Sequence, residues 1–164
     1  MKALAIAALL VTVLGAGAVL YGVKTLTPRV EFAQVSAIPA AQAREVFDTA
    51  MEQLQSRTFI GRVFSDYEGL TAEDCRLVSY TVRLENRGFF PAEWIALIVE
   101  PQSGESGRDV LQLDDGGAHV LPAGGRGDLT ATVVYAGDGG DLSRTLHIVC
   151  YVLGQEIAFD VLAQ

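Results

Sequence analysis

The sequence predicts an all-β fold, an antiparallel β-sandwich of about seven short strands preceded by a transmembrane helix and one amphipathic helix. Three observations predict it. Residues 3–23 form an uncharged, largely apolar run. Residues 39–56 carry an apolar stripe with a helical period. From about residue 58 onward, apolar residues recur with a period of two and turn residues separate the runs, as in two-sheet antiparallel sandwiches.

Length and charge limit the classes of protein that fit. The chain has 164 residues, which suits one domain with an appendage. Its 20 acidic residues outnumber its 12 basic residues, giving a net charge of −8. Nucleic acid binding requires clustered Lys and Arg, so we expect no nucleic acid partner. The hydrophobic fraction of 50% excludes a disordered chain.

The amino-terminal segment has the length of a membrane span. Residues 3–23 lie between Lys2 and Lys24, and a helix of 21 residues rises about 31 Å, which matches a hydrocarbon core. The alternative is a cleaved signal peptide, since Ala16 and Ala18 provide a small-x-small site. The apolar run continues past that site through Tyr21, which favours an uncleaved anchor. Both alternatives export the rest of the chain.

This assignment divides the chain into three parts. Residues 1–24 are the anchor or signal segment, residues 25–57 a connector with an amphipathic helix, and residues 58–164 the β-sandwich domain. The first part of the connector, residues 25–37, is either irregular or a short strand, since Val30 and Phe32 alternate but Val35 is out of step. We expect a single-pass protein of the cell membrane with its main domain extracytoplasmic, and a cleaved, secreted form as the alternative. After residue 23 the chain carries 20 acids and 11 bases, a net charge of −9.

The predicted helix at 39–56 begins at Pro39, whose fixed φ suits a first helical turn. Its apolar stripe consists of Val46, Phe47, Ala50, Met51 and Leu54. The opposite face is polar, which is typical of a helix with one buried side. The helix then either packs against the domain or the membrane-proximal side, or forms a stalk that binds a partner.

Three segments alternate between apolar residues and mostly polar ones, as half-buried strands do. Their apolar positions are Val78, Tyr80, Val82 and Leu84, then Leu129, Ala131, Val133 and Tyr135, then Ile157, Phe159 and Val161. Residues 94–99 and 146–153 are apolar on both faces, as central strands covered on each side would be, and shorter strands are expected at 58–64 and 109–113. Gly154-Gln155 predicts a type II′ hairpin turn. The pattern is typical of an immunoglobulin- or fibronectin-like sandwich.

Two stretches carry a resemblance to a family. The first is the strand of residues 80–86, ending in Asn86-Arg87-Gly88 and followed by Pro91-Ala92. The second is Leu121-Pro122-Ala123-Gly124 before the Thr-rich residues 129–134. Together, over residues 77–152, they are similar to bacterial adhesion-related, CARDB-type immunoglobulin-like modules. The resemblance implies an extracytoplasmic domain for adhesion, spacing or recognition, and it brings no catalytic residues.

The two cysteines leave two alternatives open. Cys75, Trp94 and Cys150 occur in the order of a true immunoglobulin domain, but Ile148 stands where that family prefers tyrosine. Cys75 also shares the parity of Ser79, so in a regular strand it faces away from the predicted core. An exported domain favours a Cys75–Cys150 disulfide. The alternative is two free thiols, with Cys150 as a small core residue.

Two loops are candidate interaction sites. Phe89 and Phe90 lie in the most apolar loop of the exported part, where they either plug the end of the sandwich or form a recognition patch. The tripeptide Arg126-Gly127-Asp128 is predicted to lie in a glycine-rich loop. There it is either an integrin-type adhesion site or an ordinary turn.

The acidic loops, the two histidines and Cys150 are the candidates for cation binding or catalysis. Acidic loops could together hold Ca²⁺ through Asp114, Asp115, Asp138 and Asp141. His119 and His147 lack nearby ligand partners for zinc. His147 and Cys150 are three positions apart on a predicted strand, so they project to opposite faces and cannot form a nucleophile–base pair. We expect no metal site, no cofactor and no enzymatic activity.

These observations predict a non-catalytic interaction module whose partner is a protein or another component of the cell envelope. The membrane contact is expected through residues 3–23. Two other functions remain as alternatives, a sensor domain for a small ligand or Ca²⁺, and a structural accessory subunit of a membrane assembly. The sequence specifies neither the partner nor the oligomeric state.

Overall fold

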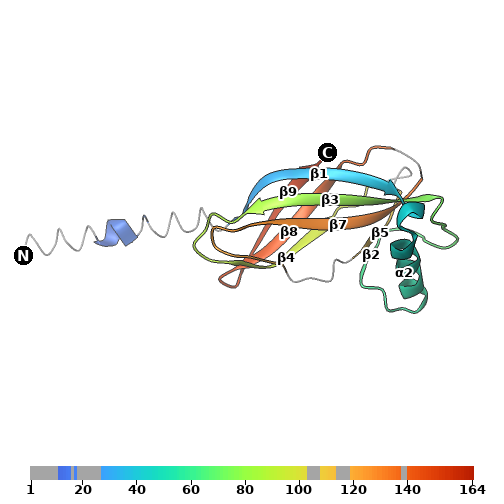
Figure 1. Cartoon of the computed structure of the whole chain (residues 1–164). Helices are drawn as coiled ribbons and strands as arrows, with labels where there is room; N and C mark the ends of the chain where they lie inside the picture. Colours follow the sequence, from blue (N-terminus) through green and yellow to red (C-terminus); the bar gives the residue numbers. More distant parts are fainter. Residues whose placement is uncertain (1–10, 16, 18–26, 103–107, 114–118, 138–139) are drawn as a thin grey trace, which may run out of the picture.

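The computed structural model describes residues 11–15, 17, 27–102, 108–113, 119–137 and 140–164. Two antiparallel sheets pack face to face (Figure 1). One sheet has the order β1 (Arg29–Pro39), β3 (Cys75–Glu85), β7 (Arg126–Ala136), β5 (Asp109–Leu113) and β2 (Gly61–Val63). The other has the order β6 (His119–Leu121), β4 (Ala92–Val99), β8 (Arg144–Val152) and β9 (Gln155–Ala163). The all-β prediction is confirmed, with nine strands in the described residues where about seven were expected.

The main core lies between the two sheets, on the faces that the alternation predicted. Val78, Tyr80 and Val82 on β3 are fully buried. The predicted apolar face of β7 packs in the same cluster, and that of β9 packs partly buried against it. Because successive strand residues point to opposite faces, the pattern of period two was sufficient to identify this core.

Strands β4 and β8 are central in the four-stranded sheet, as expected, but only one of their faces is covered. Ala96 is exposed on the outer face, and Ile98 and Val149 are partly exposed. Among the described residues no further layer packs on this side of the sheet. The apolar residues at 94–99 and 146–153 therefore predicted the central position correctly and the second covered face wrongly.

Strand β1 replaces most of the predicted connector. It is 11 residues long and pairs with β3 over its whole length, with a bulge between Val30 and Phe32. The bulge changes which residues face the core, so that Val30 and then Ala33 and Val35 pack inward. A strict period of two is absent from this segment, which is why the sequence indicated a connector.

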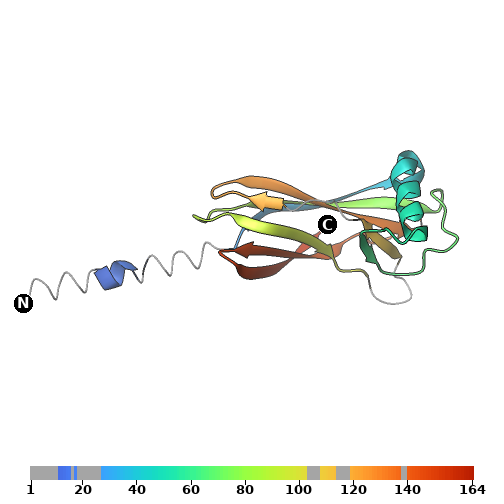
Figure 2. The same ribbon diagram turned by 90° about the horizontal axis from the view of Figure 1, so that it is seen from below.

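The predicted helix forms on the outer face of the five-stranded sheet. A 3₁₀ turn (Ala40–Ala43) leads into α2 (Arg44–Gln55), which lies at the end of the sandwich away from the start of β1 (Figures 1 and 2). Phe47 and Leu54 pack in a second cluster with Cys75 and Leu77 of β3. The interpretation that this helix packs against its own domain is therefore confirmed, while Val46 of the predicted stripe is exposed.

The apolar amino-terminal segment falls mostly outside the described residues. Residues 11–15 and 17 are helical. Within the described part of the chain, no helix combines the length and the apolar character needed to cross a membrane.

Candidate interaction surface at the proximal end

One end of the sandwich gathers the start of β1, the β3–β4 loop, the β6–β7 turn and the β8–β9 hairpin, and we call it the proximal end (Figure 1). The strand register places these segments together. Arg29 pairs with Glu85, and Glu85 with Arg126. In the other sheet Glu93 pairs with Tyr151. The end that carries α2 is the distal end.

Asn86 fixes the β3–β4 loop. Its buried side-chain amide donates to the carbonyl of Phe90 at 2.8 Å and to that of Leu121 at 3.1 Å, and its Oδ1 accepts from the Gly88 amide at 2.9 Å. Its backbone amide donates to the carbonyl of Gly125 at 2.9 Å. The Asn-x-Gly sequence thus closes a local turn and ties two loops together, which holds the two phenylalanines in a defined position.

Large apolar side chains are exposed around this end. Each retains between 43% and 70% of its accessible surface. This set, the proximal patch, consists of Phe89, Phe90, Trp94, Val120 and Leu153. Of the two alternatives for Phe89 and Phe90, a plug at the end of the sandwich or an exposed patch, the structure shows the exposed patch. Asn86 and the other three patch residues were not predicted as site residues.

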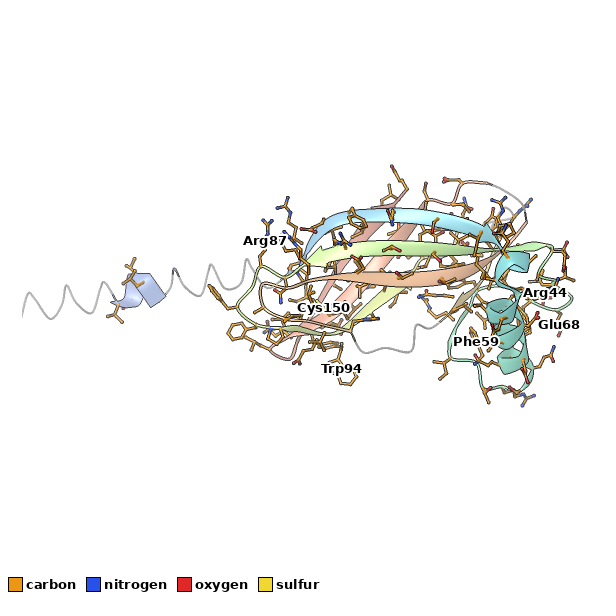
Figure 3. The ribbon with its side chains drawn as sticks, viewed as in Figure 1. Arg44, Phe59, Glu68, Arg87, Trp94 and Cys150 are labelled. Carbon is orange, nitrogen blue, oxygen red and sulfur yellow. The ribbon has the colours of Figure 1, made fainter. Side chains whose placement is uncertain are left out.

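Trp94 points away from the sandwich (Figure 3). It lies in a bulge of β4, between the paired residues Glu93 and Ala96, and has a φ of +51°. An immunoglobulin domain buries its tryptophan against the disulfide, so the comparison based on the order of Cys75, Trp94 and Cys150 is wrong at this residue. Trp94 faces outward with the alternate residues Ala96 and Ile98, and the bulge breaks the alternation only before it, so that Ala92 faces inward.

The β8–β9 turn differs from the predicted type. Val152 pairs with Gln155, so the central residues are Leu153 and Gly154, both with positive φ (+53° and +74°). This is the pattern of a type I′ turn, in which both central residues are left-handed, and not the predicted type II′ turn at Gly154-Gln155. Leu153 therefore occupies a position for which Asn, Asp or Gly is preferred.

The Arg126-Gly127-Asp128 tripeptide opens strand β7 and does not lie in a loop, which corrects the sequence-based placement. Asp128 accepts two hydrogen bonds from Arg83, both at 2.6 Å. Arg126 pairs with Glu31 and Glu85, each at 2.9 Å. Because both charged side chains are held by partners on the outer face of the same sheet, they are not displayed together on a tight loop as an adhesion tripeptide requires.

Both cysteines are free thiols in this structure. Cys150 lies in the core between the sheets, whereas Cys75 packs with α2 on the opposite face of the five-stranded sheet. The parity of Cys75 anticipated this separation, and it keeps the two sulfur atoms apart. Burial raises the pKa of both thiols, and Asp74 raises that of Cys75 further.

The other candidates for metal binding or catalysis are not assembled in the described residues. Asp114, Asp115 and Asp138 lie outside them, and the carboxylate of Asp141 accepts a hydrogen bond from the Ser143 amide, which lowers its pKa. No group of three His, Cys, Asp or Glu side chains suited to a metal is found there. His147 Nδ1 lies 2.7 Å from Asp160 on the outer face, opposite to Cys150.

A groove of about 350 Å³ lies between β4 and the β2–β5 edge, lined in part by Ile60, Arg62 and Leu97. The Gln112 amide in its lining is already hydrogen-bonded to the backbone of β4. No known protein family and no curated protein sequence matches this chain. A function must therefore be based on the fold and on the exposed apolar residues at the two ends of the sandwich. These are the proximal patch and, at the distal end, Val46, Ile60 and Val63.

Proposed function

We propose that this chain is a single-pass membrane protein whose immunoglobulin- or fibronectin-like sandwich is a non-catalytic, extracytoplasmic interaction module. The uncharged residues 3–23 support the anchor, and the packing of two antiparallel sheets supports the sandwich. The resemblance to CARDB-type modules agrees with a role in recognition. The partner in this proposal is a protein of the cell envelope.

The observation that carries the partner-binding role is a set of exposed apolar residues at the distal end. Val46 of α2, Ile60 and Val63 each keep between 47% and 70% of their accessible surface. Val46 and Ile60 line a shallow depression between the helix and the loop before β2, and the partly buried Phe59 also lines it. An apolar surface with a polar rim, here Glu45 and Gln53, is typical of protein interaction sites.

The point at which the chain enters the sandwich supports different roles for its two ends. The chain enters the sandwich at the proximal end, so the distal end is the part that reaches furthest from an anchor formed by residues 3–23 (Figures 1 and 2). The apolar stripe of α2 is largely used for packing on its own sheet. The helix therefore shapes the distal end and is not a free stalk.

Site-specific photo-crosslinking tests this proposal. A photoactivatable residue replaces Ile60 in the full chain, expressed in the membranes of its own cell, and the matched control carries it at the exposed Ala158 on the outer face of β9. We expect one discrete adduct from position 60, lost when Val46→Ser is added, and none from position 158. Identical adducts from both positions, or none from position 60, would contradict the proposed distal site. Resistance to alkaline extraction separately distinguishes an anchored chain from a secreted one.

A further inference from the structure

We propose that the proximal patch rests on the lipid bilayer, with Phe89, Phe90 and Leu153 in contact with the interfacial region and Trp94 at its margin. The inference deepens the proposed function, because it depends on anchoring through residues 3–23. It assigns a ligand, a phospholipid surface, to the end of the sandwich opposite to the proposed partner site.

The position of the patch along the chain brings it close to the membrane. Only residues 24–28 separate the apolar segment from Arg29, the first residue of β1. Six residue steps from Val23 to Arg29 span at most about 20 Å when fully extended. Arg29 pairs with Glu85, and the loop that carries the two phenylalanines begins at the next residue. The proximal patch is thus held within a short reach of the bilayer surface.

The chemistry of the side chains fits an interface. Tryptophan and other aromatic residues are enriched where membrane proteins meet the headgroup region, and exposed Phe and Leu residues anchor peripheral proteins by burial of apolar area. Trp94 is three residues into β4 and Val120 lies beside it on β6, whereas Phe89, Phe90 and Leu153 lie in the loops at the tip. The tip would thus enter most deeply, and the indole would lie nearer the headgroups.

Backbone conformation provides a second, independent observation. Three non-glycine residues in the described part of the chain have positive φ, namely Arg57, Trp94 and Leu153. Arg57 follows the end of α2, where a left-handed residue commonly closes a helix. Trp94 and Leu153 are large apolar residues that combine an unfavourable backbone conformation with exposure to solvent. Contact with lipid accounts for their presence at positions that Gly or Asn would occupy more easily.

The charges at the proximal end indicate how the contact would form. Arg126 pairs with Glu31 and Glu85, and Arg87 also pairs with Glu85. These two arginines are therefore largely neutralised by carboxylates of the same domain, and the exposed Glu93 balances the charge of Arg29 at this end. We expect the contact to depend on apolar insertion, to form on zwitterionic lipid and to change little with salt concentration.

Trp94 is the single tryptophan of the chain and reports the contact directly. The full chain is reconstituted into phosphatidylcholine vesicles, with lipids brominated on the upper part of the acyl chain as a contact quencher and iodide as an aqueous quencher. We expect Trp94 emission to shift to shorter wavelength, to fall with brominated lipid and to resist iodide. The variant F89S/F90S/L153N should lose quenching by bromine and regain quenching by iodide, whereas I38S/L162S, at exposed apolar residues outside both proposed sites, should behave as the wild type.

The single variant Leu153→Asn separates loss of lipid contact from misfolding. Asparagine suits a positive φ, so this variant should keep the fold. It should weaken bromine quenching without lowering the unfolding temperature. Flotation of the vesicles distinguishes the two proposals. A chain that floats with the vesicles but whose Trp94 is quenched by iodide and not by bromine overturns the lipid contact alone. Protection from iodide without bromine quenching indicates a protein neighbour and overturns it as well, and a chain that does not float overturns both the contact and the anchor.

Discussion

Asp109 and Arg144 form a bidentate ion pair that joins the two sheets inside the sandwich. Arg144 Nε lies 2.8 Å from Asp109 Oδ2 and Nη2 lies 3.1 Å from Oδ1, and the two side chains are 2% and 1% exposed. Arg144 Nη1 donates to the carbonyls of Asp141 and Ser143. Although burial alone lowers the pKa of Arg144, the hydrogen bond and charge of Asp109 raise it above its usual value. The pair therefore holds a charge in the core with its hydrogen bonds satisfied.

Removal of one partner should be much more harmful than removal of both. Asp109→Leu leaves the Arg144 charge buried without a counterion, and such changes cost about 3–5 kcal/mol of unfolding free energy. The double variant Asp109→Leu/Arg144→Met replaces the pair by apolar side chains and should recover most of that loss. Urea unfolding of the full chain in mild detergent, followed by circular dichroism, measures the difference. A double variant as unstable as the single one would mean that the pair itself is favourable.

Tyr80 should make the protein sensitive to alkali. Burial raises its pKa from 10.0 to about 12, and its hydroxyl donates to the carbonyl of Leu142 at 3.0 Å. The pKa of Tyr80 is higher in the folded protein than in the unfolded chain. Its contribution to the free energy of unfolding is therefore fully present below pH 10 and is lost as the pH rises toward 12. A shift of this size corresponds to roughly 3 kcal/mol.

Unfolding free energies measured between pH 9 and pH 12, a window of about three units around these pKa values, test this dependence. Tyr80→Phe should be less stable at neutral pH, because the hydrogen bond is lost, but its stability should fall less steeply in alkali. Val133→Ala, a core change that removes no titratable group, should keep the slope of the wild type. Equal slopes for all three proteins would show that Tyr80 does not titrate with unfolding.

The cysteines should be unreactive in the folded protein and equally free after unfolding. Both are buried with raised pKa values and lie on opposite faces of the five-stranded sheet. Because the thiolate is the reactive form, a maleimide reagent at pH 7, close to neutrality, should label neither thiol before denaturation and both after it, without prior reduction. Dithiothreitol should leave the unfolding temperature unchanged. Labelling that requires a reductant would instead indicate a disulfide.

Phe47 and Val46 allow a matched test of how α2 is attached. Phe47 is buried against the five-stranded sheet, while its neighbour Val46 is exposed at the proposed partner site. Phe47→Ala should lower the unfolding free energy by about 3–5 kcal/mol, whereas Val46→Ala should change it by less than about 0.5 kcal/mol. Denaturation curves of the two variants measure this contrast. Similar small effects would mean that the helix contributes little to stability.

The parts of the fold that could be predicted are those with an undisturbed period. The inward faces of β3 and β7 followed from alternation alone, and the parity of Cys75 correctly separated it from Tyr80. Strand β1 was predicted only as a connector or a short strand, because its bulge between Val30 and Phe32 breaks the alternation. Local periodicity records which face a residue would occupy in a regular strand, so it fails wherever a strand is irregular.

The candidate site was less predictable, because the position of most of its residues depends on how strands far apart in the sequence pair and pack. Phe89 and Phe90 were identified because apolar residues in a loop are conspicuous. Trp94 was assigned to a strand covered on both faces, whereas the outer face of β4 that carries it is open. Leu153 lay in a predicted strand, and only the pairing of Val152 with Gln155 shows that it is a turn residue. Asp128 looked like part of a loop because two glycines precede it, yet its cross-strand partner Arg83 is 45 residues away. Such partners are set by tertiary pairing.

The Gln112 side chain covers the open edge of β4 in the four-stranded sheet. Beyond its pairing with β6, strand β4 has a free edge, and there the Gln112 side chain accepts from the Val99 amide at 2.9 Å and donates to the Leu97 carbonyl at 2.8 Å. The primary amide thus supplies the donor and the acceptor that a neighbouring strand would supply. Gln112→Ala leaves both backbone groups unpaired, which should cost about 1–3 kcal/mol, and exposes an edge that can pair with other chains. Denaturation and light scattering of the variant, with the exposed Gln155→Ala as control, should show lower stability and faster aggregation for Gln112→Ala alone.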